Sequence, residues 1–390
     1  MPSALLETEH DFYALSASQQ PDWNDHTELS TIRTKISQAS YMIDPAHVDQ
    51  LRLLLGDVAA GNMKIIQAGD CAEDPADRTP DRLSWKIGLI QAIAHVMRVN
   101  TGKPVLCVGR IAGQFAKPRS AAYEVVDGLE LPSYRGPLVN RPEPDTEARR
   151  HDPSLLLKCH EAAAAMTSYL NGPEEHAAVP LLWTSHEALV LDYELPQLHR
   201  FDERLLLTSA HWPWVGERTR HPLGAHVALL SAIANPVASK VGPDATETDL
   251  LELCGRLDPR REPGRLTLIA RMGPVASETL PPLVGAVRKA GHPAIWLCDP
   301  MHGNTVQAPG SRKTRFVEAI TQEVRTFQEA VVQAGGVAGG LHLEATPDPV
   351  TECVADETEL EQVGRRYTSL CDPRLNPRQA VAVAAEWITS

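Results

Sequence analysis

Short apolar runs alternate with longer amphipathic segments from about residue 61 to the end of the chain. Each run is five to eight residues long, the length of a buried strand. Strands are predicted at 63–69, 104–110, 180–185, 205–212, 238–242, 266–272, 294–300 and 340–346. Helices are predicted at 82–100, 153–170, 223–234, 246–256, 276–290, 312–335 and 376–389.

This alternation predicts the fold class. Eight strands with helices between them are typical of an α/β protein with a (β/α)8 barrel, known as a TIM barrel. A doubly wound open sheet is the alternative fold that is also compatible with this pattern. Residues 1–60 are more polar, so we expect an N-terminal extension with a role in packing or oligomerisation. The catalytic barrel is expected over 61–390.

Charge and cysteine content indicate which partners and which cellular compartment to expect. The 390 residues have a formal net charge of −13, which disfavours nucleic acid or an anionic membrane surface as a general partner. No apolar run approaches the roughly 18 residues of a membrane span, and the first residues lack a signal-peptide pattern. Seven scattered cysteines without a CxxC pair indicate a reducing compartment. We therefore expect a cytoplasmic protein with neither nucleic-acid nor membrane partners. A homo-oligomer, either dimer or tetramer, is a separate expectation.

Basic residues follow several of the predicted strands. In barrel enzymes the active site lies at the carboxyl ends of the strands. Arg110, Arg218, Lys240 and Arg271 lie at or after the second, fourth, fifth and sixth strands. Such cations repel one another unless an anion lies between them, and guanidinium groups suit phosphate and carboxylate. Each could instead be a rim residue paired with an acid, but their convergence favours substrates with two anionic groups.

A second group of residues has the chemistry of metal ligands. Strands seven, eight and one are neighbours in a closed barrel. His302 follows strand seven, Glu344 lies in strand eight and Cys71 follows strand one, while Asp372 lies in a later loop. A thiolate, an imidazole and two carboxylates suit Mn²⁺, Co²⁺, Fe²⁺ or Zn²⁺. A lone cysteine is usually buried filler and a lone histidine a hydrogen-bonded polar residue. The spacing alone leaves both interpretations open.

Nine motifs, in order along the chain, resemble those of the type II 3-deoxy-D-arabino-heptulosonate 7-phosphate (DAHP) synthases. They are GDCAE (69–73), GRIAGQFAKPRS (109–120), SYRG (133–136), SHEALVLDYE (185–194), WVGERTR (214–220), ANPVASKVGP (234–243), GRLTLIARMG (264–273), CDPMHGNT (298–305) and CDPRLNP (371–377). The resemblance runs from about residue 15 to the C-terminus. It implies a barrel with an N-terminal extension. It also implies the metal-dependent condensation of phosphoenolpyruvate with erythrose 4-phosphate, the first step of the shikimate pathway.

The resemblance also implies residue roles. The divalent-metal ligands, commonly for Mn²⁺ or Co²⁺, correspond to Cys71, His302, Glu344 and Asp372. Phosphoenolpyruvate contacts correspond to Arg110, Glu217, Arg218, Lys240 and Arg271. The erythrose 4-phosphate loop corresponds to Lys117, Pro118, Arg119 and Ser120. Catalytic roles are expected for Lys117 as proton donor, Glu187 or Glu217 as the group that directs water, and Asp372 beside the metal.

One connection departs from the longer members of the family. These carry a two-helix insert before the third strand that helps to form effector sites for aromatic amino acids. Here only NGPEEHAAV (171–179) separates the predicted helix and strand. We therefore expect a short form that aromatic amino acids do not regulate, of the kind associated with secondary metabolism. Two alternatives remain: an amino-DAHP synthase that takes an amino or imino tetrose phosphate, and a non-catalytic paralogue.

Overall fold

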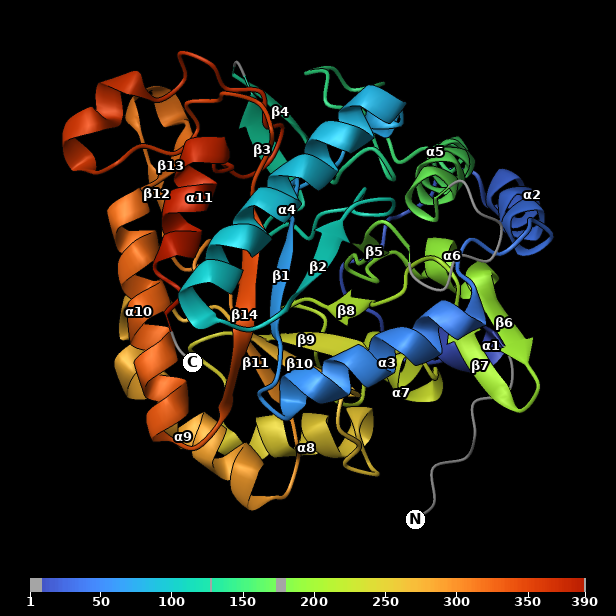
Figure 1. Cartoon of the computed structure of the whole chain (residues 1–390). Helices are drawn as coiled ribbons and strands as arrows, with labels where there is room; N and C mark the ends of the chain where they lie inside the picture. The colour runs from blue at the N-terminus through green and yellow to red at the C-terminus, as the bar shows by residue number, and fades with distance from the viewer. Residues whose placement is uncertain (1–8, 127, 173–179, 389–390) are drawn as a thin grey trace.

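A single sheet of eight parallel strands lies at the centre of the computed structural model, which describes residues 9–126, 128–172 and 180–388 (Figure 1). Its members are β1 (Lys64–Gly69), β2 (Val105–Arg110), β5 (Trp183–Thr184), β8 (Trp214–Val215), β9 (Val237–Val241), β10 (Leu266–Ala270), β11 (Ile295–Cys298) and β14 (Val337–Glu344). They are ordered β5-β2-β1-β14-β11-β10-β9-β8, and every pairing is parallel.

The two ends of this sheet meet. Just beyond β5, Glu187 forms a parallel bridge with Trp214 of β8. The Trp214 N–H donates to the carbonyl of His186 at 3.1 Å, and the Ala188 N–H donates to the carbonyl of Trp214 at 2.9 Å. The sheet is therefore closed, which confirms the predicted (β/α)8 barrel and excludes the open sheet.

The prediction of a fourth barrel strand at 205–212 is wrong. Residues Arg204–Leu207 form β7, which pairs with β6 (Leu198–Phe201) in an antiparallel hairpin outside the barrel. The barrel strand is β8, only two residues long. A strand this short has no periodic pattern, whereas the leucine run before it has the composition of a buried strand.

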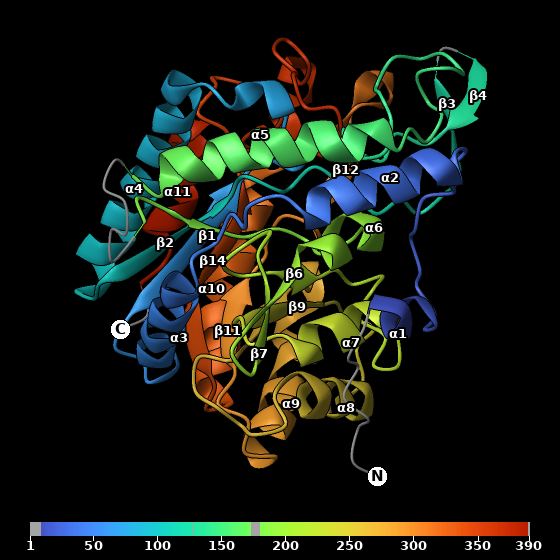
Figure 2. The same ribbon diagram turned by 90° about the vertical axis from the view of Figure 1, so that its right-hand side faces the viewer.

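Helices surround the barrel (Figures 1 and 2). They are α4 (Pro80–Thr101), α5 (Ser154–Leu170), α6 (Leu191–Glu194), α7 (Ala225–Ala232), α8 (Glu247–Leu257), α9 (Ala276–Lys289), α10 (Val317–Gln333) and α11 (Pro377–Ala385). Short 3₁₀ turns are η1 (Pro75–Asp77), η2 (Leu195–Gln197), η3 (Gly273–Val275), η4 (Pro309–Ser311) and η5 (Glu357–Gln362). In α10, Ile320, Val324, Phe327 and Val331 are buried, because a spacing of three and four residues places them on the same face.

The predicted helix over 312–335 begins later than expected. Residues Lys313–Arg315 form β13, which pairs with β12 (Thr305–Gln307). A second hairpin, β3 (Tyr123–Val126) with β4 (Leu129–Pro132), lies on the same side of the barrel (Figure 2). Both hairpins follow barrel strands in sequence and contribute residues to the cavity described below.

The N-terminal extension forms three helices, α1 (Glu9–Tyr13), α2 (His26–Ser37) and α3 (Pro45–Ala59). Leu51, Leu55 and Val58 of α3 pack with barrel residues such as Ile65, so α3 covers the amino-terminal end of the barrel. Helix α2 packs beside α5 (Figure 2). The boundary between extension and barrel near residue 60 stays a prediction.

The short connection before the third strand and the absence of a membrane span can be compared only with the residues that the structure describes. Helix α5 ends at Leu170, as predicted, but 173–179 of the short connection lie outside the described residues. In the part of the chain that the structure describes, no helix has both the length and the apolar character needed to cross a membrane.

Candidate active site

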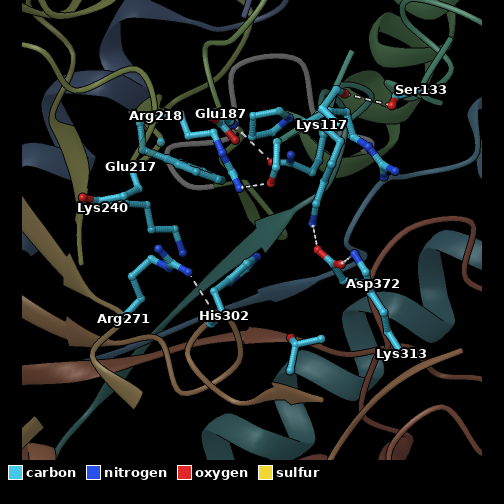
Figure 3. Close-up of a pocket in the computed structure, with 18 of the residues that line it drawn as sticks. Lys117, Ser133, Glu187, Glu217, Arg218, Lys240, Arg271, His302, Lys313 and Asp372 are labelled. Carbon is cyan, nitrogen blue, oxygen red and sulfur yellow. Dashed lines mark hydrogen bonds and ion pairs between the residues drawn. The ribbon is translucent and has the colours of Figure 1, made fainter. Parts of the chain in front are cut away.

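A cavity of about 340 Å³ opens at the carboxyl ends of the barrel strands (Figure 3). Cys71 and Glu344 are buried behind its wall. The other predicted site residues line it: Arg110, Lys117, Pro118, Arg119, Ser120, Glu187, Glu217, Arg218, Lys240, Arg271, His302 and Asp372. Together with Cys71 and Glu344, these residues come from the carboxyl-terminal parts of all eight barrel strands or from the loops that follow them.

The four predicted metal ligands are neighbours. Cys71, Glu344 and Asp372 each offer a ligand atom within 4.8 Å of the other two. His302 Nε2 lies 3.2 Å from Glu344 Oε1. The ammonium of Lys117 lies among them, 2.7 Å from Asp372 Oδ2, 3.2 Å from Glu344 Oε1 and in contact with the Cys71 thiol. These groups therefore surround a position that already holds a positive charge.

The electrostatics of this cluster fit a divalent cation. Glu344 is fully buried, which by itself would raise its pKa, but His302, Lys117 and Arg315 hold that pKa well below its usual range. Burial likewise opposes ionisation of Asp372, and Lys117 and Arg315 outweigh it and lower its pKa. One buried and one partly buried ionised carboxylate beside a thiol and an imidazole form a donor set that Mn²⁺, Co²⁺, Fe²⁺ and Zn²⁺ all accept.

Asp299 orients the His302 ring. Its Oδ2 lies 2.8 Å from His302 Nδ1, which leaves Nε2 facing Glu344. A carboxylate on the far nitrogen of a ligating histidine fixes the ring and its tautomer. Asp299 also pairs with Lys240, so it links the metal cluster to the cationic wall. The sequence predicts no role for Asp299, although it lies in the motif CDPMHGNT.

Three of the predicted cations, Arg110, Lys240 and Arg271, line the cavity next to the metal cluster. Arg110 is buried, and its Nη2 lies 3.2 Å from Glu344 Oε1. Its guanidinium and the Lys240 ammonium lie over the ring of Trp214, at 5.7 Å and 5.0 Å from the centroid. Burial, with repulsion from Arg110, lowers the pKa of Lys240 to about 8. Arg271 Nη2 donates to the carbonyl of His302 at 2.8 Å.

Two carboxylates face the same cavity. Burial raises the pKa of Glu187, and its Oε1 has no hydrogen-bond partner among the described residues. A Cβ at Gly216 would lie 2.0 Å from that oxygen, so only glycine leaves room for it. Glu217 accepts from Arg220 through Oε1 at 2.7 Å, while its Oε2 is also unpartnered in the described chain. Both residues therefore keep an acceptor oxygen free.

The loop Lys117–Ser120 spans the cavity from the metal cluster to the rim. Lys117 points toward Asp372 in Figure 3, whereas Arg119 forms an ion pair with Glu124 of β3. The Ser120 hydroxyl accepts from Arg218 Nη2 at 2.7 Å. Arg218 therefore contacts this loop while lining the same cavity as Arg110, Lys240 and Arg271.

Glu73 holds the chain that leads into this loop. Its carboxylate accepts the N–H groups of Gly113 and Gln114, both at 3.0 Å, and that of Ala112 at 3.2 Å. These bonds support Ala112 in a left-handed conformation, with φ of 65°. Glu73 is part of the motif GDCAE, but the sequence indicated no function for it.

Arg315 and Lys313 were missed altogether. Arg315 is fully buried and its Nη1 lies 2.8 Å from Glu344 Oε2, while Lys313 Nζ lies 2.8 Å from Asp372 Oδ1. Both were assigned to a helix, where they would have been ordinary surface cations. The alternation of Lys313, Thr314 and Arg315 is the strand signal that could have placed them on the cavity side.

Comparison with known proteins agrees with this geometry. The model of the Class-II DAHP synthetase family matches residues 7–181 and 173–387. The chain belongs to this family. It is 53% identical over 378 residues to the "Probable phospho-2-dehydro-3-deoxyheptonate aldolase" of Pseudomonas fluorescens, covering 95% of this chain and 94% of that protein. It is 36% identical over 429 residues to the phospho-2-dehydro-3-deoxyheptonate aldolase AroG of Mycolicibacterium smegmatis, covering 95% and 92%.

The enzyme class predicted from the motifs, a 3-deoxy-7-phosphoheptulonate synthase, is confirmed with the family. Among solved structures, a truncated 3-deoxy-D-arabino-heptulosonate 7-phosphate synthase from Thermotoga maritima matches 83% of this chain and 84% of that one. The identity is 16% and the TM-score 0.39. The barrel fold of this DAHP synthase rests instead on its own strand order and closure.

Proposed function

We propose that this cavity condenses phosphoenolpyruvate with erythrose 4-phosphate to give DAHP and inorganic phosphate, with a divalent metal held by Cys71, His302, Glu344 and Asp372. The observation that supports it best is the placement of a metal donor set, three cations and a second basic loop around one cavity. Mn²⁺ or Co²⁺ is the expected metal, with Fe²⁺ and Zn²⁺ as alternatives.

The two substrates are assigned to different walls. Arg110, Lys240 and Arg271 hold the carboxylate and phosphate of phosphoenolpyruvate, since all three face the inner cavity. Arg119 and Ser120, at the rim, receive the phosphate of erythrose 4-phosphate, and Arg218 lies between the two pockets. The aldehyde end of the tetrose then points inward, toward Lys117. Holding both reactants in this way can lower the activation free energy by up to about 7–11 kcal/mol.

A divalent cation bound at this site would polarise the aldehyde oxygen as a Lewis acid. C3 of phosphoenolpyruvate forms a bond to the aldehyde carbon, and the Lys117 ammonium gives a proton to the new alkoxide. Glu187 or Glu217, each with a free acceptor oxygen, takes a proton from the water that adds at C2. The bond between C2 and the bridging oxygen of the hemiketal phosphate then breaks, and the proton of the C2 hydroxyl passes to the departing phosphate, which leaves the ketone of DAHP.

The compartment, oligomeric state and partners of the enzyme form a separate proposal. We propose a cytoplasmic homo-oligomer, a dimer or tetramer, without nucleic-acid or membrane partners, in keeping with the net charge of −13. Light scattering that gave the mass of one chain would contradict the oligomer. A role in secondary metabolism rests on the short connection 171–179 and stays a prediction.

Erythrose 4-phosphate is expected to be the preferred tetrose. The competing substrate is an amino or imino tetrose phosphate, and the rim loop would hold its phosphate equally well. We therefore propose to measure phosphate release and product mass with phosphoenolpyruvate and each tetrose in turn. A higher kcat/KM with erythrose 4-phosphate supports the proposal, whereas a higher value with the nitrogen-containing tetrose would make the enzyme an amino-DAHP synthase. No phosphate release with either would favour the non-catalytic alternative.

A further inference from the structure

The segment between α1 and α2 crosses the barrel close to the rim of the cavity. Gln20 attaches it to the loop after β5: its Nε2 donates to the Leu189 carbonyl at 2.8 Å, and its Oε1 accepts the Leu191 N–H at 2.9 Å. The buried Trp23 donates its indole N–H to Asp192 Oδ2 at 2.8 Å. Gln20 and Trp23 are thus held against residues 189–192, which lead from the loop after β5 into α6.

Gln19, next to this attachment, contacts the tetrose-phosphate loop directly. Its Oε1 accepts the backbone N–H of Arg119 at 2.9 Å, across 100 residues of sequence. Its backbone carbonyl accepts from Arg135 Nη1, also at 2.9 Å. The φ of Gln19 is 63°, in the left-handed region that side chains other than glycine rarely adopt. An uncommon backbone conformation is maintained at the residue whose side chain reaches the loop.

The neighbouring Ser18 contacts Arg218, which in turn contacts the same loop. Its hydroxyl donates to the carbonyl of Arg218 at 3.0 Å. The guanidinium of Arg218 in turn donates to the Ser120 hydroxyl at 2.7 Å. The N-terminal segment therefore bonds to both Arg218 and the loop that Arg218 contacts.

The loop needs such support because of its charge. The Lys117 N–H donates to the carbonyl of Arg135 at 2.9 Å, and the Arg119 N–H donates to Gln19. Arg135 therefore holds the first residue of the loop and Gln19 holds the third. Arg119 and Arg135 are both positive, and burial together with Arg119 lowers the pKa of Arg135. Gln19 is a neutral group that accepts hydrogen bonds from both residues. It links the two guanidinium-bearing segments without adding a further negative charge to the one that Glu124 already places beside Arg119.

We propose that Gln19 is a positioning residue for the loop Lys117–Ser120, and that the N-terminal segment 18–20 is thereby part of the active site. This inference rests on the proposed function of that loop as the tetrose-phosphate pocket. The extension, expected from sequence to serve packing or oligomerisation, then has a direct effect on one substrate and not on the other.

The test compares two variants at the same position. Gln19→Gly removes the side-chain acceptor while allowing the left-handed backbone, and Gln19→Glu retains a carboxyl oxygen at the same place. Tyr13→Phe, which removes a bond from Tyr13 to Asp192 elsewhere in the extension, is the control. We expect Gln19→Gly to raise the KM for erythrose 4-phosphate about fivefold, the effect of one hydrogen bond, with the KM for phosphoenolpyruvate unchanged. Tyr13→Phe is expected to keep both values. Gln19→Glu keeps the acceptor but adds a negative charge beside Arg119, so it is expected to raise the KM for erythrose 4-phosphate while leaving the exchange of the Arg119 amide as in the wild type.

Hydrogen exchange of the loop provides a readout that needs no activity. The amide of Arg119 is expected to exchange faster in Gln19→Gly than in the wild type or Gln19→Glu, because it loses its acceptor. An unchanged exchange rate would overturn the proposal, as would an equal rise of both KM values or faster exchange with an unaltered KM for the tetrose. If the wild type does not use erythrose 4-phosphate, the proposed function fails, and the exchange rate still decides whether Gln19 holds the loop.

Discussion

Removal of the divalent cation is expected to lower the rate of condensation roughly a thousandfold, because Lewis-acid polarisation contributes several kcal/mol and each 1.36 kcal/mol is tenfold in rate. Chelation followed by Mn²⁺ or Co²⁺ should restore the activity. Cys71→Ser and His302→Ala should each weaken metal binding, measured as metal bound per chain after gel filtration. A thiolate-to-cobalt absorption band should disappear in Cys71→Ser.

The matched control for the thiol is Cys107→Ser. Cys107 is a half-buried cysteine of β2 that does not line the cavity, so its loss should leave both metal content and rate unchanged. Full activity after exhaustive chelation, or in a variant that lacks both Cys71 and His302, would contradict the assignment of the metal site.

Loss of Arg271 is expected to affect phosphoenolpyruvate, and loss of Arg119 the tetrose phosphate. Removing a charged hydrogen-bond partner costs about 2–5 kcal/mol, so the affected KM should rise about 30-fold or more. Arg271→Ala should therefore raise the KM for phosphoenolpyruvate, and Arg119→Ala that for erythrose 4-phosphate. Steady-state kinetics with one substrate varied at a time separate the two effects.

Arg204→Ala is the control for this pair, since Arg204 pairs with Asp49 outside the cavity and about two-fifths of its side chain is exposed. Its loss should change neither KM. A rise of the same KM in both Arg271→Ala and Arg119→Ala would show that the two cations serve one pocket, and the assignment of substrates to separate walls would be wrong.

The barrel and much of its site could be predicted because both depend on local signals. An apolar run that ends in Arg110 or Arg271, or that contains Lys240 near its end, places a cation at the carboxyl end of a strand. The carboxyl ends of all the strands lie on the same side of a barrel, so these cations line one cavity. The nine motifs then separate metal ligands from substrate contacts, which spacing alone does not. Glu344 and Cys71 could be placed in the same way, although the structure shows them behind the cavity wall and not on it.

The rest could not be predicted because it depends on contacts distant in sequence. The strand β8 is two residues long and is held by bonds to the residues after β5, so nothing in its own composition marks it. Arg315 reaches Glu344 only because β12 and β13 form a hairpin in place of a helical turn. Gln19 lies in a polar segment without periodicity, and its partner Arg119 is 100 residues away.

The most direct test of the central claim uses phosphoenolpyruvate labelled with ¹⁸O in the oxygen that bridges carbon and phosphorus. The wild-type enzyme is incubated with this substrate, erythrose 4-phosphate and Mn²⁺, and both products are analysed by mass spectrometry. If Glu187 or Glu217 directs water to C2, the ketone oxygen comes from water and the labelled oxygen leaves with the phosphate. The account therefore predicts one unlabelled DAHP for each phosphate released, with the label entirely in the phosphate. Label retained in the carbon product, or pyruvate formed in place of DAHP, would contradict the account.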